Sequence, residues 1–197
     1  MTTASAASPC VLGVHCGAAR PLPVGGRQVL SSIAKQPVAG RCAVRRLGLE
    51  GDEQADLSVH GGLEKAVHAY PVEHAPFWQA LLGDRGEVEP LRSGGLGENL
   101  SIAGVLEADM YVGDTWQFPD CVLRVSLPRI PCAKLNAALR HPRAARHMAE
   151  SGRCGTYLAV VTPGTIEAGE AFTVVPGPRD VTLLSLFGVS RTKTRHD

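Results

Sequence analysis

Turn-forming residues interrupt this sequence at short intervals, and this feature limits the folds that it can adopt. Glycine occurs 22 times and proline 14 times in 197 residues, both above average use, whereas aromatic residues make up only 5%. Proline ends helices and central strands, and glycine favours turns. The pattern therefore predicts an α+β, β-rich fold with a few short helices rather than a helix bundle.

Alternation of side chains identifies the clearest strands. Residues 121–127 place Cys121, Leu123, Val125 and Leu127 on one face, which is the period-2 pattern of a sheet. Together with residues 111–118 and the turn Pro119-Asp120, this segment predicts a hairpin. A first strand is expected at 11–16, with Leu12, Val14 and Cys16 on one face and His15 on the other. Other extended segments are expected at 38–47, 65–70, 157–161 and 171–175, with a short one after Asn99.

Three short helices are expected between these strands. The first spans about 71–82, with Phe77, Trp78, Leu81 and Leu82 as its buried stripe, unless Pro76 delays its start. The other two follow a proline-rich break and cover 132–139 and 142–150.

The size and charge of the chain restrict its organisation and partners. We expect one domain over residues 11–176, a loose tail at 1–10 and a short C-terminal tail at 177–197. The formal net charge is only +1, so no global field favours nucleic acid or an anionic membrane. No apolar run is long enough to span a bilayer, and the N-terminus lacks the features of a secretory signal.

The six cysteines form no C-x-x-C pair, which disfavours a zinc finger. A chain of this size does not need disulfides for stability, so we expect mostly reduced thiols and a cytoplasmic location.

The strongest local motif is PRIPCAKL, residues 128–135, between a strand and a helix. Cys132 would lie at the helix N-terminus, where unpaired N–H groups and the helix dipole favour a thiolate. Arg129 and Lys134 add positive charge nearby. A thiolate can attack an electrophile or bind a metal. The alternative is that Cys132 is a small buried apolar residue.

Two glycine-rich motifs accompany it. In HGGLEKAVH, residues 60–68, Gly61 and Gly62 could expose backbone N–H groups to an anion, Lys65 could bind a phosphate, and His60 and His68 could transfer protons. In GGLGENL, residues 94–100, Gly97, Glu98 and Asn99 could surround a flat heterocycle. For both motifs the alternative is an ordinary turn. The acidic loop Glu50, Asp52, Glu53 and Asp56 matches no ligand spacing, and we expect it to be solvated.

Taken in order, these segments resemble the MOSC family, named after the C-terminal domain of molybdenum cofactor sulfurases, and within it the YiiM-like bacterial branch. The resemblance spans about residues 11–175 and depends on GLEGDEQAD, HGGLEKAVHAYPVEH, GLGENLSIAG, YVGDTWQF, VSLPRIPCAKLN and ESGRCGTYLAVVTPGTIEAGE. It implies a MOSC-type, β-barrel-like core. It also implies a molybdopterin-type molybdenum cofactor with Cys132 as the protein ligand of the metal.

The resemblance further implies that the three motifs line one cofactor pocket. The implied cofactor-binding residues are His60, Gly61, Gly62, Lys65, Gly97, Glu98, Asn99, Arg129 and Lys134, with Cys132, His60 and His68 as catalytic candidates. Several relatives reduce N-hydroxylated compounds, such as hydroxylamino-purines and amidoximes, to amines. Pyridoxal phosphate binding, also associated with the family, is not expected of this chain.

This sequence departs from the family pattern at Leu96, Ala69 and Ala133, where Phe, His and Trp are common, so substrate shape is expected to differ. YiiM-type relatives carry a three-helix extension after the barrel, which is expected to be cut short or replaced here.

The leading hypothesis is therefore a molybdenum-dependent reductase with a small N-hydroxylated substrate. There is no G-x-G-x-x-G nucleotide fingerprint, so we expect electrons from a separate donor protein. A homodimer is left open. The alternatives are a non-catalytic carrier of the cofactor or its sulfur, an enzyme with Cys132 as nucleophile, and a domain that has lost its function.

Overall fold

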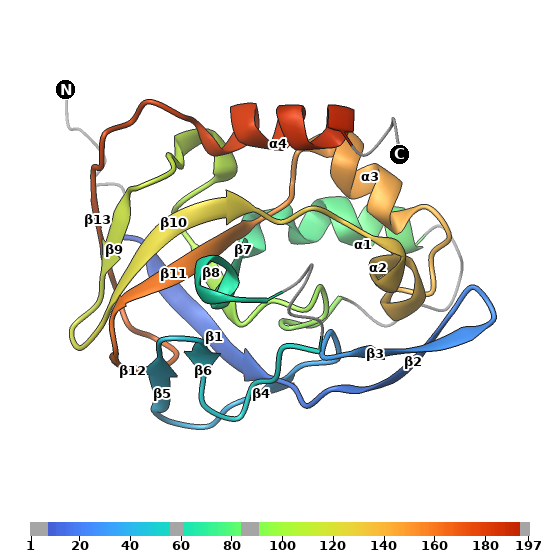
Figure 1. Cartoon of the computed structure of the whole chain (residues 1–197), viewed down its shortest axis with the longest axis horizontal. Coiled ribbons are helices and arrows are strands. Elements are labelled where there is room, and N and C mark those ends of the chain that lie inside the picture. Colours follow the sequence, from blue (N-terminus) through green and yellow to red (C-terminus); the bar gives the residue numbers. More distant parts are fainter. Residues whose placement is uncertain (1–7, 56–60, 84–90, 194–197) are drawn as a thin grey trace.

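One mixed sheet dominates the structure. This computed structural model describes residues 8–55, 61–83 and 91–193, with side chains described as far as 188. Eight strands pair in the order β13-β9-β10-β11-β7-β8-β1-β4, and neighbours are antiparallel except β7 and β8, which run parallel (Figure 1). The strands are β1 (Cys10–Cys16), β4 (Gln36–Pro37), β7 (Val67–Pro71), β8 (Leu100–Ala103), β9 (Thr115–Gln117), β10 (Val122–Pro128), β11 (Thr156–Thr162) and β13 (Thr173–Val175).

Backbone hydrogen bonds connect the two ends of this sheet. Ahead of β13, the Gly169 N–H donates to Val11 O at 2.7 Å and the Phe172 N–H donates to Pro9 O at 2.9 Å. Among the described residues no ladder joins β13 to β4, so the sheet is barrel-like without being a closed barrel. The β-rich α+β class predicted from the turns is confirmed.

Two smaller sheets flank the large one. One contains β12 (Gly164–Ile166), β5 (Cys42–Arg45) and β6 (Gly48–Leu49). The other is a hairpin of β2 (Arg20–Val24) and β3 (Arg27–Ser31), which projects from the body of the molecule (Figure 1). The extended segment expected at 38–47 is thus shorter than predicted. Strand β12 was missed because it lies within an expected turn-rich connection.

The helices are short, as predicted. They are α1 (Ala75–Gly83), α2 (Ala133–Ala138), α3 (Ala144–Ser151) and α4 (Leu183–Lys193), with 3₁₀ turns η1 (Leu63–Lys65), η2 (Val72–His74) and η3 (Glu107–Asp109). Pro76 lies in the first turn of α1, where its missing N–H has no intrahelical partner to lose. The buried stripe is narrower than predicted, since Trp78 and Leu82 are buried whereas Phe77 and Leu81 are only partly so.

The faces of β1 differ from the prediction. A register shift between Val11 and Gly13 in the β1–β8 ladder interrupts the alternation. Val11 and Val14 therefore face the core, whereas Leu12 is 52% exposed. His15 is also buried, although it was expected on the opposite face from Val14. A bulge adds one residue to a strand and reverses the faces beyond it.

Two apolar clusters stabilise the fold, and α4 contacts both. The larger one fills the concave side of the sheet and includes Trp116, Leu123 and Leu183. The smaller lies among the helices and includes Trp78, Met148 and Phe187. The segment after residue 176, expected to be a short tail, is therefore part of the packed domain. Within the described ranges, no helix has the length and apolar character needed to cross a bilayer.

Candidate functional site

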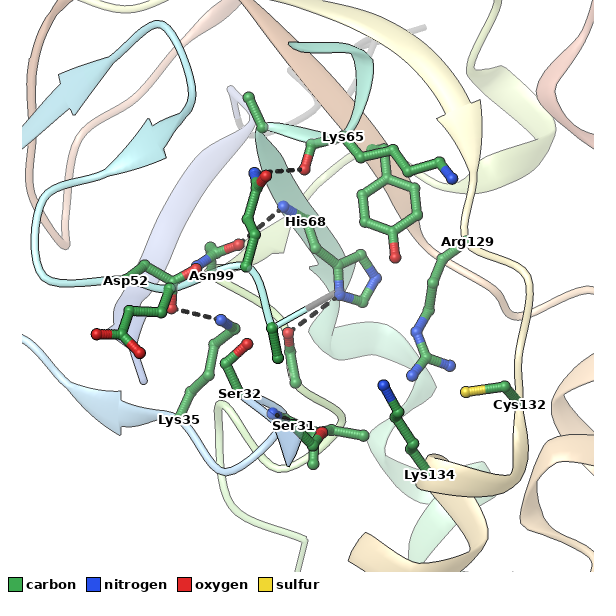
Figure 2. A pocket seen from close by; sticks show the side chains of 17 residues that line it. Ser31, Ser32, Lys35, Asp52, Lys65, His68, Asn99, Arg129, Cys132 and Lys134 are labelled. Carbon is green, nitrogen blue, oxygen red and sulfur yellow. Dashed lines mark hydrogen bonds and ion pairs between the residues drawn. The ribbon is translucent and has the colours of Figure 1, made fainter. Parts of the chain in front are cut away.

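A single cleft collects most of the residues that the three motifs predicted. It has a volume of about 630 Å³, counting the space that opens to solvent. Figure 2 shows the side chains around it. They come from the chain after β3, the loop before η1, strand β7, the loop before β8, the start of α2, and β11: Ser31, Ser32, Ile33, Lys35, Asp52, Glu53, Gln54, Ala55, Lys65, Ala66, His68, Gly97, Asn99, Arg129, Cys132, Lys134 and Tyr157.

Cys132 occupies the N-cap of α2, as predicted, and is half-buried. Its backbone is extended (φ −139°, ψ 177°), and its carbonyl accepts the Leu135 N–H at 3.0 Å. Because α2 has only six residues, its dipole is weaker than the sequence argument assumed. The charge at this site comes mainly from side chains.

Arg129 and Lys134 lie beside Cys132 (Figure 2). Arg129 is only 5% exposed, yet neither cation forms an ion pair with any carboxylate in the described parts of the chain. The recorded side-chain bond of Arg129 runs from Nη1 to the Met148 sulfur, at 3.2 Å. We call Arg129, Cys132 and Lys134 the cationic wall. A buried cation without a counter-anion is costly, and an anionic ligand would offset that cost.

His68 lies between the walls of the cleft as a neutral ring. Burial and the nearby Arg129 guanidinium lower the pKa of His68 to about 3. Its Nδ1 contacts Gly97 O at 3.4 Å, and the buried Nε2 has no hydrogen-bond partner among the described residues. An Nδ1–H donor to Gly97 would leave Nε2 as an acceptor. The predicted role of His68 in proton delivery near neutral pH does not fit this low pKa.

The polar side chains on the opposite side of the cleft bond to one another and to the backbone. Lys35 and Asp52 form an ion pair at 2.5 Å, with only 7% and 8% of their side chains exposed. The Asp52 carboxylate also accepts the Gly17 N–H and the Asn99 amide, each at 2.8 Å. We call Lys35, Asp52 and Asn99 the ion-paired wall. The expectation that this acidic loop is simply solvated is wrong for Asp52.

Asn99 has no amide hydrogen left to donate to a heterocycle. Its Oδ1 accepts the His68 N–H at 3.0 Å, and its Nδ2 donates to His15 O at 3.1 Å and to Asp52. Both amide hydrogens are therefore used within the protein. Asn99 therefore joins β7, β1 and the 52–55 loop, and a ligand contact through its N–H groups would replace one of these bonds.

Glu98 is not among the residues that line the cleft. Its carboxylate turns into its own loop, where it accepts the N–H groups of Gly94 at 2.6 Å and Leu96 at 3.0 Å and the Ser101 hydroxyl at 3.0 Å. Burial raises the pKa of Glu98. Gly97 does line the cleft, and its φ of +83° and a contact of 2.7 Å between an added Cβ and Ile33 both favour glycine.

The HGG motif contributes less to the cleft than predicted. His60 lies outside the described residues. Gly61 and Gly62 are absent from the lining, and the Gly62 N–H donates to Gln54 Oε1 at 2.8 Å instead of pointing at a ligand. Lys65 does line the cleft.

Sequence reasoning missed several lining residues. Lys35 and Ser32 belong to no motif and lie far from Cys132 in the chain. Asp52 and Gln54 lie within GLEGDEQAD, so the resemblance covered them although the acidic loop was interpreted as solvated. Tyr157 was recognised only as a strand residue. Burial raises the pKa of Tyr157, so its phenol keeps its proton.

The other cysteines behave as packing residues. All six thiols are free. Burial raises the pKa of Cys16 and of Cys121 to about 12, and it also raises the pKa of Cys42 and Cys154. In the described ranges no three His, Cys, Asp or Glu side chains are grouped as a metal cage.

The sequence is similar to one protein family and to several known proteins. A family model described as the MOSC domain matches residues 56–173. Protein YiiM of Escherichia coli (strain K12) is 37% identical over 153 residues, covering 78% of this chain and 67% of that protein. The uncharacterized protein YflK of Bacillus subtilis (strain 168) is 35% identical over 159 residues, covering 81% and 70%. A Gibberella moniliformis protein named "Reductase" is 35% identical over 180 residues, covering 90% of this chain but 31% of that protein.

Solved structures have the same fold. YiiM from Geobacillus stearothermophilus superposes with a TM-score of 0.74 at 27% identity, covering 94% of this chain and 85% of the other. YiiM from Escherichia coli gives a TM-score of 0.66 at 29% identity, covering 86% and 74%.

Proposed function

Because this chain belongs to the MOSC family, we propose that it is a molybdenum-cofactor-dependent reductase of N-hydroxylated compounds, with the Cys132 thiolate as the protein ligand of the metal. One observation carries the proposal: the half-buried cysteine lies in a cleft beside two cations without carboxylate partners in the described chain. The relative named "Reductase" supports the direction of the reaction.

The charge of the cleft suits a phosphorylated pterin. The phosphate would pair with Arg129 and Lys134, and the planar arginine fork can bind two of its oxygens. The cost of burying Arg129 would then be offset by the ligand rather than by another residue.

When bound, the cofactor supplies the redox chemistry that removes the oxygen of an N–OH group. The protein chain positions the cofactor and the substrate and offers hydrogen bonds to them. Neutral His68 accepts a hydrogen bond at Nε2, and the protonated phenol of Tyr157 can donate one to the substrate. Cys132, at the N-cap of α2, would hold the metal. A cytoplasmic location is part of the proposal, because six free thiols suit a reducing compartment.

The alternative of a cysteine nucleophile has weaker support. Such an enzyme needs a base close to the thiol. His68 is the one histidine in the described lining, and a ring with a pKa of about 3 is a poor base at neutral pH.

The metal assignment is tested by elemental analysis. Wild type, Cys132→Ser and Cys10→Ser would be produced in a host that makes the cofactor, and molybdenum and released pterin measured per protein chain. Cys10 is a half-buried thiol on β1 outside the cleft, so it is a matched control. We expect metal in wild type and Cys10→Ser, and a loss of about tenfold or more in Cys132→Ser. Equal metal in all three proteins would refute the ligand assignment.

Turnover separates a reductase from a carrier. Loaded protein would be given an aromatic amidoxime or a hydroxylamino-purine together with reduced methyl viologen. We expect amine formation that requires Cys132. Bound cofactor with no amine from either substrate would indicate the carrier instead.

A further inference from the structure

Positive charge is concentrated in the segment that forms the cationic wall and continues beyond it. Residues 129–153, through α2 and α3, contain Glu150 as their one carboxylate, although the whole chain carries only +1. The cations of this segment are Arg129, Lys134, Arg140, Arg143, Arg146 and Arg153. Arg129 and Lys134 line the cleft, whereas Arg140, Arg143 and Arg146 are exposed.

These exposed cations are held on a rigid unit. The Asn136 side chain accepts the Ala145 N–H at 2.8 Å, and its carbonyl accepts the His141 N–H at 3.0 Å, so α2 and α3 are bonded together. The His141 and His147 rings also meet edge to face, with centroids 5.5 Å apart. A preorganised surface loses little entropy when a partner docks.

The β2–β3 hairpin lies beside this segment and carries further exposed cations. Helices α2 and α3 lie together on one side of the molecule, and β2 packs against α2 (Figure 1). The hairpin adds exposed Arg20 and Arg27, and the sequence contains no acidic residue before Glu50. Arg143 has no carboxylate partner in the described chain, and the exposed Arg146–Glu150 pair at 2.7 Å contributes little.

We propose that the α2–α3 segment and the β2–β3 hairpin together form the docking surface for a carboxylate-rich electron-donor protein. The inference rests on the proposed function. Converting R–NHOH to R–NH₂ and water breaks the N–O bond and consumes two electrons and two protons per turnover. A flavin or iron–sulfur redox protein would supply the electrons and become oxidised in the process.

The position and chemistry of the surface favour such a partner. It begins at Cys132, so a protein docked there lies beside the proposed metal ligand. Electron-transfer encounters are small and depend on complementary charge, which raises the association rate. Residues 129–153 contain no Phe, Trp or Tyr, so they lack the stacking platform on which single-stranded nucleic acids rely.

The test uses loaded full-length protein and a bacterial flavodoxin kept reduced by its NADPH-dependent reductase. The double variant Arg143→Glu/Arg146→Glu reverses two exposed charges on the surface. Arg45→Glu/Arg46→Glu makes the same charge change away from it, at two exposed positions: the last residue of β5 and the residue that follows. At low salt we expect the first variant to lose about tenfold or more in kcat/KM for flavodoxin and most of its salt dependence. The control should stay within about twofold.

Two further measurements distinguish a failure of the docking inference from a failure of the proposed function. Reduced methyl viologen needs no docking surface, so its turnover should be similar in all three proteins; no turnover in wild type would count against the proposed function instead. Flavodoxin binding, measured by calorimetry at low salt, tests docking independently of turnover. Equal affinity or equal kcat/KM in both double variants would overturn the inference. So would tighter binding of a single-stranded oligonucleotide that only Arg143→Glu/Arg146→Glu abolishes.

Discussion

The two walls of the cleft satisfy their charges in opposite ways. In the ion-paired wall, Lys35, Asp52 and Asn99 bond to one another and to the backbone, and little of their capacity remains for a ligand. In the cationic wall, Arg129 is as deeply buried as Lys35 but has no carboxylate among the described residues. The difference indicates that the first wall is scaffold and the second is the part prepared for an anion.

Asp52→Ala should produce the largest effect because it breaks the scaffold. It leaves the Lys35 ammonium buried without its counter-charge, and we expect a loss of about 3–5 kcal/mol in the free energy of unfolding. Urea denaturation of the metal-free protein measures it. Glu53→Ala, at an exposed neighbour in the same loop, is the control and should cost less than about 1 kcal/mol. Similar costs for the two variants would remove the distinction between the walls.

Asn99→Ala should come next. It removes the hydrogen-bond partner of the His68 N–H and of the His15 carbonyl, and it removes one of the bonds that hold the Asp52 carboxylate. These losses should lower the free energy of unfolding by about 2–3 kcal/mol. Molybdenum per folded chain should change little. If stability were unaffected but the cofactor were lost, Asn99 would be a ligand contact after all.

Arg129→Met should have a smaller effect of the opposite sign. Removing a buried cation without an anion should stabilise the metal-free protein by about 1–2 kcal/mol. The same variant should retain less cofactor. Lys134→Met, at a half-buried position, should change stability by less than about 0.5 kcal/mol. A destabilised metal-free Arg129→Met protein would show that Arg129 belongs to the scaffold.

His68→Gln should change the pH dependence of stability. The unfolded histidine gains a proton below pH 6.5, whereas the folded ring stays neutral to about pH 3. Wild type therefore loses stability as pH falls through this window, by up to about 1.4 kcal/mol per pH unit. The glutamine variant lacks this loss, so the stability difference between the proteins should shift in its favour from pH 6.5 to 5. Parallel curves would mean that folding does not lower the pKa of His68.

The sequence predicted what depends on local pattern. Alternation at 121–127 located β10 and its hairpin partner β9, and the PRIPC break located Cys132 at the start of α2. Leu12 was assigned to the wrong face because a bulge, set by pairing with β8, cannot be seen in a single strand. Pro76 gave the helix start within one residue because its effect is local.

Site residues could be predicted only where the chemistry of their side chains stands out within a short sequence motif. Cys132, Arg129 and Lys65 belong to motifs, and all three reach the cleft. Asn99 has suitable chemistry for ligand binding, but its bonds to His68, His15 and Asp52 join segments far apart in the chain. Lys35 gave no local signal, because its importance depends on where Asp52 folds. Whether the hydrogen-bonding groups of a side chain are already used within the protein depends on the tertiary structure, so it cannot be predicted from a local pattern.

The contact of α4 with both apolar clusters limits how this domain can be cut or grafted. The family model covers residues 56–173, which excludes β1, the hairpin, Leu183 and Phe187. A fragment with those boundaries would expose one edge of β8. It would also leave both apolar clusters without the α4 side chain that packs into each. Chimaeras that exchange substrate loops between relatives should therefore carry residues 9–187 as one inseparable block.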